Sequence, residues 1–330
     1  MKTVEIRTSP RPRILVTHLI HDQVLRLLKK HFSVDHNATG RGLSRRALLR
    51  KLRTADGVIS FMPDIIDKEF LDAAPHLKII TAALKGFDNI DVDEIVRRKI
   101  VLKISRSLLT KPTAELILAL MLGISRNIFA GNSLVRQHRF KTWLPRLYGN
   151  SLEGKTAGII GMGMIGWQLA RSLRSLGMHV IYCDNGQIPN SRSNGTKVDL
   201  NQLLREADYV IPLTPLTRAT YHMIGKEQVG KMKLGAYIIN AGRGSLVDEA
   251  AISVALRSGK LEGYAADVFE MEDFSVTGHP KEINKYLLTS EKTLLTPHLG
   301  SAVKEVRLSI EMEAAENLVR FFKRSTILRR

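Results

Sequence analysis

The sequence TAGIIGMGMIG, residues Thr156–Gly166, is the most informative stretch of this chain. An apolar run typical of a strand leads into a GxGxxG turn, and a helical pattern follows over residues 167–176. In such a turn the first two glycines, Gly161 and Gly163, let the backbone approach a pyrophosphate, and the third, Gly166, lets the helix pack on the strand. The stretch therefore predicts a dinucleotide site at a helix N-terminus.

The next predicted strand, residues 180–182, is followed by Asp184, which lies 18 positions after Gly166. A carboxylate there accepts hydrogen bonds from the ribose hydroxyls of the adenosine and repels a 2′-phosphate. The pattern therefore predicts NAD as the cofactor. Asn185 follows directly, but Arg192 is near enough to leave some use of NADP open.

Strand and helix patterns alternate on both sides of this stretch, which is typical of βαβ units and parallel sheets. In the second half, six strands are predicted at 156–160, 180–182, 209–211, 237–239, 264–268 and 293–295. In the first half, strands are predicted at 14–16, 58–60, 77–81 and 100–102, with helices near 22–30, 45–52 and 92–98. A long helix over about 113–138 separates the halves. The expected fold is α/β with two sheets.

Composition excludes several classes of protein. The 330 residues are 44% hydrophobic and 25% charged, as in a soluble globular protein of two domains. One cysteine, Cys183, excludes a disulfide framework and fits a cytoplasmic location. The apolar run 116–124 is too short to span a membrane, and no histidine spacing suggests a metal site. Lys and Arg number 50 against 32 Asp and Glu, a net charge of +18, without a nucleic-acid-binding motif. Such a charge attracts polyanions, anionic surfaces or small anionic substrates, and charge alone does not choose among them; a solvated basic surface is favoured over a nucleic-acid site.

Three further segments, 240–245 (NAGRGS), 266–272 (ADVFEME) and 296–298 (TPH), resemble the D-isomer-specific 2-hydroxyacid dehydrogenase family. The resemblance implies a Rossmann-type, doubly wound NAD-binding domain over 109–296. It also implies a flavodoxin-like α/β substrate domain over 1–108, completed by a C-terminal helix within 297–330. Family members of this kind form homodimers, so a homodimer is expected.

The resemblance also implies roles for individual residues. Arg243 would hold the substrate anion, His298 would exchange a proton with the reacting group or water, and Glu272 would orient the imidazole. Besides the glycines and Asp184, the implied cofactor contacts are Lys85, Thr113, Met164, Ile165, Thr214, Pro215, Ala241, Gly242, Arg243, Asp267, His298 and Ser301.

The segments 61–64 (FMPD), 84–89 (LKGFDN), 108–110 (LLT) and 112–115 (PTAE) resemble the phosphonate (phosphite) dehydrogenase branch of that family. This implies NAD-dependent oxidation of phosphite to phosphate. Lys85 would add a second cation beside Arg243, because phosphite carries more negative charge than a carboxylate. The pocket residues implied are Met62, Trp143, Tyr148 and Arg307, of which Trp143 and Tyr148 could come from a partner subunit.

Two other functions stay open. The first is a reductase of glyoxylate, hydroxypyruvate or another 2-oxo acid, which would use the same Arg243, Glu272 and His298. The second is an NAD-sensing corepressor, because such proteins share the fold. Three positions depart from the phosphite-oxidising pattern. That pattern has a Pro near position 106, a Cys at position 242 and a Trp at position 274, whereas this chain has Arg106, Gly242 and Phe274.

Overall fold

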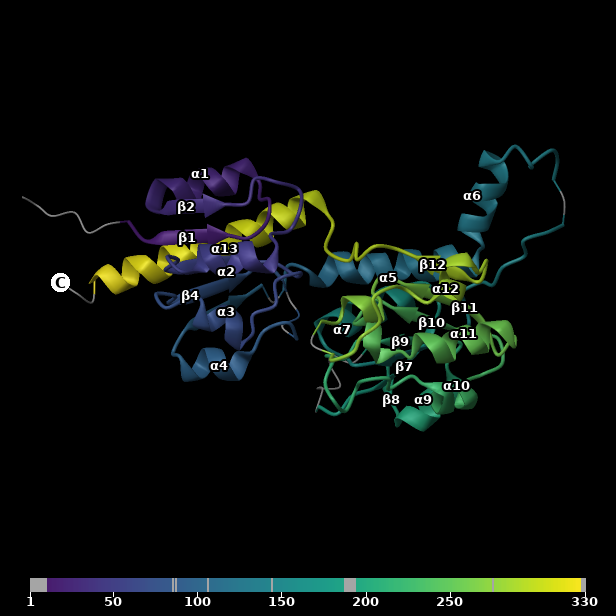
Figure 1. The fold of residues 1–330 in the computed structure, drawn as a ribbon. Helices are drawn as coiled ribbons and strands as arrows, with labels where there is room; N and C mark the ends of the chain where they lie inside the picture. The colour runs from purple at the N-terminus through teal and green to yellow at the C-terminus, as the bar shows by residue number, and fades with distance from the viewer. Residues whose placement is uncertain are drawn as a thin grey trace, which may run out of the picture. The chain divides into compact units, whose positions relative to one another are not determined.

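The computed structural model describes residues 11–84, 86, 88–105, 107–143, 145–186, 194–274 and 276–327. The chain forms two compact units (Figure 1). Unit 1 comprises residues 1–108 and 304–330, and unit 2 comprises residues 109–303. Three residues that the sequence analysis singled out, Lys85, Arg106 and Arg192, lie outside the described residues.

Unit 1 contains a five-stranded parallel sheet in the order β2-β1-β3-β4-β5. The strands are β1 (Arg13–Val16), β2 (Ser33–His36), β3 (Gly57–Ser60), β4 (Ile79–Ala82) and β5 (Val101–Ile104). The helices are α1 (Asp22–His31), α2 (Arg45–Leu52), α3 (Lys68–Asp72), α4 (Val92–Arg97) and α13 (Lys304–Ile327). This strand order is that of flavodoxin, which confirms the predicted α/β fold.

The two faces of this sheet are covered by different helices, because side chains alternate along each strand. Leu15 packs into one apolar cluster with α2, α3 and α4. On the other face a methyl group on Gly57 would lie 3.1 Å from Leu318 of α13. Helix α13 thus closes unit 1 although it is distant in sequence. Strand β2 was not predicted, because its sequence SVDH is polar and lies at the sheet edge.

Unit 2 contains a seven-stranded parallel sheet in the order β12-β11-β10-β9-β6-β7-β8 among the described residues. The strands are β6 (Thr156–Ile160), β7 (His179–Cys183), β8 (Thr196–Lys197), β9 (Tyr209–Pro212), β10 (Ala236–Asn240), β11 (Leu261–Ala266) and β12 (Thr293–Leu295). Counted from β6, the order is 3-2-1-4-5-6 with one further strand, so the doubly wound Rossmann arrangement is confirmed. The two-residue strand β8 is not among the six strands predicted for this half of the chain.

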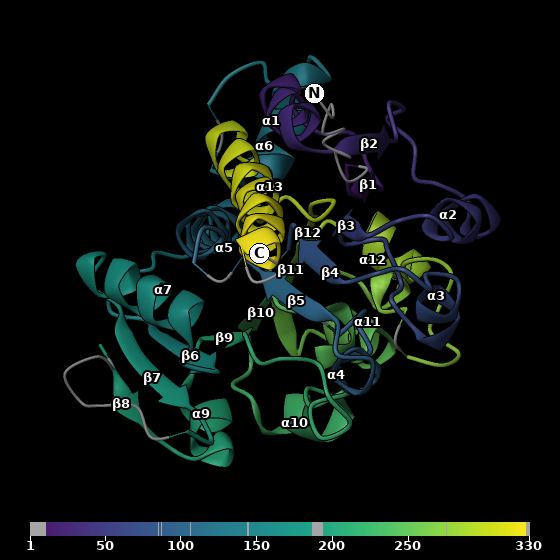
Figure 2. The same cartoon turned by 90° about the vertical axis from the view of Figure 1, so that its left-hand side faces the viewer.

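Helices cover both faces of the second sheet. They are α5 (Thr110–Ser125), α6 (Ile128–Arg136), α7 (Met164–Ser175), α9 (Leu200–Glu206), α10 (Lys226–Lys231), α11 (Glu249–Arg257) and α12 (Lys285–Thr289). Helices α5 and α7 share one apolar cluster with the strands, and α9 to α12 share the other. Figure 2 shows α7 and α9 on opposite sides of β6 and β7. Two short 3₁₀ helices, η1 (Gly244–Leu246) and η2 (Glu270–Glu272), follow β10 and β11.

The single long helix predicted over 113–138 is wrong. The chain breaks at Asn127, whose φ of +52° is left-handed and cannot continue an α-helix. Helix α6 buries none of its side chains and projects from the body of unit 2 (Figure 1). Among the described residues, no single helix is long and apolar enough to cross a membrane; only α5 and α6 taken together pass that test, and they are bent by 65°.

The second unit ends at Val303, whereas the sequence predicts that the chain leaves the NAD-binding domain after residue 296. Residues 297–303 stay with unit 2 because Asp267 accepts hydrogen bonds from the backbone N–H groups of Leu299 and Gly300. His298 is therefore a residue of the second unit.

Candidate active site

The glycine-rich turn joins β6 to α7. Gly161 has a φ of +100°, and a methyl group there would lie 3.0 Å from the carbonyl of Leu213. A methyl group on Gly166 would lie 2.5 Å from the carbonyl oxygen of Gly161, so the helix packs too closely for a side chain. In contrast, no atom lies within 4 Å of a methyl group on Gly163, the N-cap of α7. The turn is therefore packed at its two ends and open at its centre, where a pyrophosphate would approach the helix N-terminus.

Asp184 lies directly after β7 and beside this turn. One carboxylate oxygen accepts a 2.7 Å hydrogen bond from the Met162 N–H, and the other accepts a 2.7 Å bond from the Gly186 N–H. Both bonds fix the carboxylate where a ribose would bind. The residues present therefore fit an NAD molecule whose pyrophosphate lies at Gly163.

Arg243 follows β10 in a loop that a buried amide shapes. The Asn240 side chain donates to the carbonyl oxygen of Arg243 at 2.8 Å and accepts from the Gly242 N–H at 3.2 Å. Arg243 is half-buried, and its Nη1 donates to the Gly242 carbonyl oxygen at 2.8 Å. The guanidinium thus belongs to a constrained loop at the carboxyl end of a central strand, where ligands bind in sheets of this kind.

His298 and Glu272 are paired, as the family resemblance implies. Nδ1 of His298 lies 2.6 Å from one Glu272 oxygen, and the other oxygen accepts from the Phe269 N–H at 2.9 Å. Both side chains keep about a third of their surface exposed, at 33% and 27%. Because the carboxylate engages Nδ1, it orients the ring and leaves Nε2 for proton transfer.

Asp267 organises the segment that carries His298. The Asp267 side chain is buried and accepts from Leu299 N–H at 2.7 Å, Gly300 N–H at 2.9 Å and the Thr296 hydroxyl at 2.6 Å. Burial raises the pKa of Asp267, although these hydrogen bonds act against the rise. His298 has a φ of +55°, so the backbone here is held in a left-handed conformation that few residues adopt.

Apart from Lys85, which is outside the described residues, the other predicted cofactor contacts lie around the same edge of the second sheet. Thr113, near the start of α5, contacts the Gly300 carbonyl oxygen at 3.3 Å, next to Ser301. The Pro215 carbonyl oxygen accepts from Thr220 at 2.7 Å, which shapes the turn after β9. The remaining predicted contacts lie at the start of α7 (Met164 and Ile165), after β9 (Thr214) and after β10 (Ala241 and Gly242).

In unit 1, Met62 and Arg307 lie near the carboxyl ends of the strands. Met62 packs against the apolar cluster formed with α2, α3 and α4. Arg307 donates from Nη1 to the Ala83 carbonyl oxygen at 3.4 Å, and its guanidinium lies 5.6 Å from the centre of the Phe61 ring. Burial lowers the pKa of Arg307, and the buried carboxylate of Glu311, 3.8 Å away, opposes this. Lys85, the cation predicted for the substrate anion, is outside the described residues.

Trp143 and Tyr148 lie in the arm, which we define as residues 128–143 and 145–150, and they are 75% and 78% exposed. Asn127 ties the base of the arm together, because its side chain donates to the carbonyl oxygens of Leu147 at 3.3 Å and Tyr148 at 3.0 Å. Within unit 2, Trp143 and Tyr148 thus lie on the exposed arm and not on the loops that carry Arg243 and His298.

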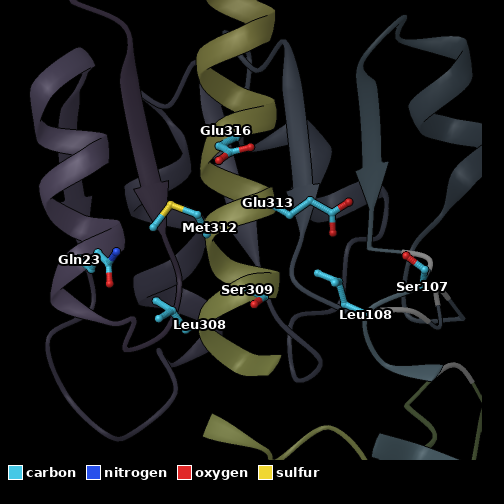
Figure 3. A pocket seen from close by; sticks show the side chains of 8 residues that line it. All are labelled: Gln23, Ser107, Leu108, Leu308, Ser309, Met312, Glu313 and Glu316. Atoms are coloured by element: carbon cyan, nitrogen blue, oxygen red, sulfur yellow. The ribbon is translucent and has the colours of Figure 1, made fainter. Parts of the chain in front are cut away.

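A hollow of about 460 Å³ occurs elsewhere in unit 1, along the face of α13 (Figure 3). It is lined by Gln23, Ser107, Leu108, Leu308, Ser309, Met312, Glu313 and Glu316. Helical spacing puts these α13 residues on the side of the helix opposite Arg307 and Glu311. In the described part of the chain, no three His, Cys, Asp or Glu side chains gather in a way that could hold a metal ion.

Sequence reasoning missed the buried residues that hold these loops. They are Asn240, Glu249, Glu270 and Asp273. Three of them lie within or beside the quoted motifs, but a motif does not reveal which neighbours are buried. A charged residue without an exposed surface can be identified only from the fold.

The fold of unit 2, its glycine-rich turn and the His298–Glu272 pair define the class of this protein, an NAD-dependent oxidoreductase. The chain belongs to the D-isomer specific 2-hydroxyacid dehydrogenase family, because residues 118–300 match the NAD binding domain of that family. A glyoxylate reductase of Thermococcus litoralis is 35% identical over 320 residues, which cover 95% of this chain and 94% of the relative.

Solved structures are similar over nearly the whole chain. The TT0316 protein of Thermus thermophilus has 34% sequence identity and a TM-score of 0.84, over 93% of this chain and 96% of that one. A D-lactate dehydrogenase from Aquifex aeolicus, solved with NAD and lactic acid, has 26% identity and a TM-score of 0.83, over 94% and 95%. The predicted family and the predicted cofactor are confirmed.

Proposed function

We propose that this protein reduces a small 2-oxo acid of the glyoxylate type to the corresponding 2-hydroxy acid. The observation that carries the proposal is the His298–Glu272 pair at 2.6 Å, in the same unit as Arg243 and the NAD-binding turn. Full-length relatives named glyoxylate reductase, including the 35% identical Thermococcus litoralis protein, support this choice of substrate over phosphite.

Each of the three side chains has one task in this reaction. Arg243 binds the substrate carboxylate with its planar guanidinium, which fixes the direction of the carbonyl group. His298 donates a proton from Nε2 to the carbonyl oxygen, and Glu272 holds the ring by Nδ1 and so orients Nε2. NAD, when bound, supplies the hydride in its reduced form. The substrate carbon thus gains a hydride and its oxygen gains a proton.

Oxidation of phosphite is a second candidate function, and specific segments favour it. The sequences FMPD (61–64) and LKGFDN (84–89) resemble the phosphite-oxidising branch of the family, and they place a lysine, Lys85, three positions after Ala82 at the end of β4. In this reaction Arg243 and Lys85 bind the dianion. His298 removes a proton from the attacking water, so that phosphite, water and oxidised NAD give phosphate, NADH and a proton.

One pair of spectrophotometric assays separates the candidates. Purified protein is mixed with NADH and glyoxylate or hydroxypyruvate, and separately with NAD and phosphite, while absorbance at the NADH band is recorded. Consumption of NADH with the 2-oxo acids supports the first proposal. Formation of NADH with phosphite, at a kcat/KM well above that for glycolate or D-lactate oxidation, would replace it with the second. The His298→Asn protein is the control, because it should be inactive in both assays.

The family resemblance leads us to expect a homodimer, and we propose one for this protein. Apolar side chains of the arm are exposed, among them Phe129, Phe140 and Trp143. Large apolar side chains exposed on one segment are typical of a subunit interface. We therefore propose that a second copy of the chain covers the arm.

A further inference from the structure

The loops that carry Arg243 and Glu272 touch each other through their backbones. A methyl group on Gly244 would lie 1.9 Å from the carbonyl carbon of Phe269 and 2.3 Å from the amide nitrogen of Glu270. No side chain fits there, so η1 and η2 lie directly against each other. A shift of either loop would therefore move the other.

A buried carboxylate links the same two loops. Asp273, the residue directly after Glu272, is 3% exposed, and its Oδ2 accepts a 2.6 Å hydrogen bond from the Ser245 N–H. Ser245 lies two residues after Arg243 and is itself buried. A hydrogen bond with an ionised acceptor is stronger than a neutral one, and in a buried setting it is little weakened by water.

Two further carboxylates, those of Glu249 and Glu270, hold η2 in place. Glu270 Oε1 accepts from the Glu249 N–H at 2.8 Å, and Glu249 Oε1 accepts in return from the Glu270 N–H at 3.0 Å. The second Glu249 oxygen accepts from the Asn284 N–H at 3.1 Å. These bonds fasten η2 to the start of α11. Asp273 therefore joins the Arg243 loop to a segment that other hydrogen bonds already hold in place.

We propose that Asp273 is a positioning residue for the reaction. Its hydrogen bond to Ser245 sets the place of the Arg243 guanidinium relative to the Glu272–His298 pair, and so aligns the bound oxyanion with the group that transfers the proton. The proposal rests on the proposed function, in which Arg243 binds the oxyanion and His298 acts on it. It extends that function to a residue that touches neither substrate nor cofactor.

The geometry favours this role over a general contribution to stability. The backbone amide that Asp273 binds, that of Ser245, is close in sequence to the predicted anion-binding residue. Misplacing a substrate by about 1 Å can reduce a rate about 100-fold. Loss of the bond should therefore act on the oxyanion more than on NAD. The loop carries three of the implied cofactor contacts, Ala241, Gly242 and Arg243, but the glycine-rich turn and Asp184 lie after other strands, β6 and β7.

The test compares Asp273→Ala and Asp273→Asn in the full chain. We expect Asp273→Ala to lower kcat/KM for the oxyanion that the wild type uses by about 100-fold. NADH affinity, measured by fluorescence titration without oxyanion, should change by less than about threefold, since η1 and η2 do not carry the glycine turn. Asp273→Asn should recover most of the activity, because its amide oxygen still accepts from Ser245.

Asp56→Ala is the matched control. Asp56 also accepts a hydrogen bond from a backbone amide distant in sequence, that of Arg13 at 2.9 Å, but it lies in unit 1, whereas η1 and η2 lie in unit 2. Equal kcat/KM values for Asp273→Asn and Asp56→Ala, with a much lower value for Asp273→Ala, would support the positioning role. If Asp273→Ala does not fold, the Asp273→Asn protein still tests the proposal. Its amide oxygen can accept from Ser245, so a kcat/KM below about one tenth of the wild-type value, at unchanged melting temperature, would contradict the positioning role.

Two other outcomes distinguish a failure of this inference from a failure of the proposed function. A wild type that converts the oxyanion, together with Asp273→Ala and Asp56→Ala proteins of equal kcat/KM, would overturn the inference alone. A wild type that acts on neither glyoxylate, hydroxypyruvate nor phosphite would overturn the proposed function, and the inference would fall with it.

Discussion

Nδ1 of His298 lies 2.6 Å from a carboxylate oxygen of Glu272, and His298 makes this contact from a left-handed backbone with a φ of +55°. A non-glycine residue in that conformation costs about 1 kcal/mol or more, so its surroundings must hold it there. Asp267 does so by binding the next two backbone N–H groups. Two features therefore fix the segment around His298. One is the buried carboxylate of Asp267, and the other is the half-buried contact between His298 and Glu272.

The first prediction concerns His298. Asn tolerates left-handed backbone better than most residues, so His298→Asn should remove the imidazole without disturbing the loop. We expect kcat to fall by about 100- to 10,000-fold, because the proton donor is lost, with little change in melting temperature. Steady-state kinetics and thermal unfolding measure the two effects. An active His298→Asn protein would exclude His298 as the proton donor.

Asp184 allows a prediction on cofactor choice. Asp184→Asn keeps an oxygen that can accept from the Met162 or Gly186 N–H but removes the charge that repels a 2′-phosphate. The ratio of kcat/KM for NADP to that for NAD should rise by about 10-fold or more, as expected when a charge contact worth about 1.4 kcal/mol is lost. Kinetics with both cofactors at one ionic strength provide the measurement. An unchanged ratio would mean that Asp184 does not select the cofactor.

The glycines of the turn should respond differently to alanine. Gly166→Ala should lower the melting temperature, because the new methyl group would meet the Gly161 carbonyl oxygen at 2.5 Å. Gly163→Ala has open space around it and should fold normally, but the methyl group would occupy the place of the pyrophosphate and weaken NADH binding.

Thermal unfolding and NADH fluorescence titration separate these two effects. Gly230→Ala in α10 is a suitable control, because nothing lies within 4 Å of its added methyl group and a helix interior favours alanine. Normal NADH binding by Gly163→Ala would show that the pyrophosphate lies elsewhere.

Much of this site follows from sequence because its residues stand in motifs of fixed spacing. The turn, Asp184 and the strand pattern suffice to place NAD at β6 and β7. The His298–Glu272 contact joins residues 26 positions apart and could be inferred only through the family resemblance. The buried, backbone-binding roles of Asp267 and Asp273 were beyond motif reasoning, since they depend on bonds to other loops. The break at Asn127 was also missed, because an apolar pattern does not reveal one left-handed residue.

Asp56 leads to a prediction on pH. Burial raises the pKa of this carboxyl, but hydrogen bonds from the Arg13 N–H at 2.9 Å and the Lys78 ammonium at 2.6 Å outweigh burial and hold the pKa below its usual range. A pKa that is lower in the folded state stabilises the protein above the unfolded pKa of about 3.9, and this contribution is lost as the pH falls through the folded pKa.

Asp56→Asn should therefore reduce the free energy of unfolding at pH 7 and have a smaller effect near pH 3. Urea unfolding of both proteins at the two pH values measures the difference. If the substitution costs the same free energy at both pH values, the ionised carboxylate is not the source of the stabilisation.

The last prediction concerns the arm. Phe129 of α6 is 62% exposed, and α6 buries none of its side chains in its own subunit. An isolated helix of this length is marginally stable in water, so apolar contacts from a second subunit would stabilise α6. We expect the wild type to sediment as a dimer and Phe129→Asp to shift it toward the monomer, because a charge in an apolar interface must lose its hydration. Val254→Asp is the matched control, since Val254 is 58% exposed on α11 in the same unit. A wild type that sediments as a monomer, or a Phe129→Asp protein that dimerises as strongly as Val254→Asp, would contradict an interface at the arm.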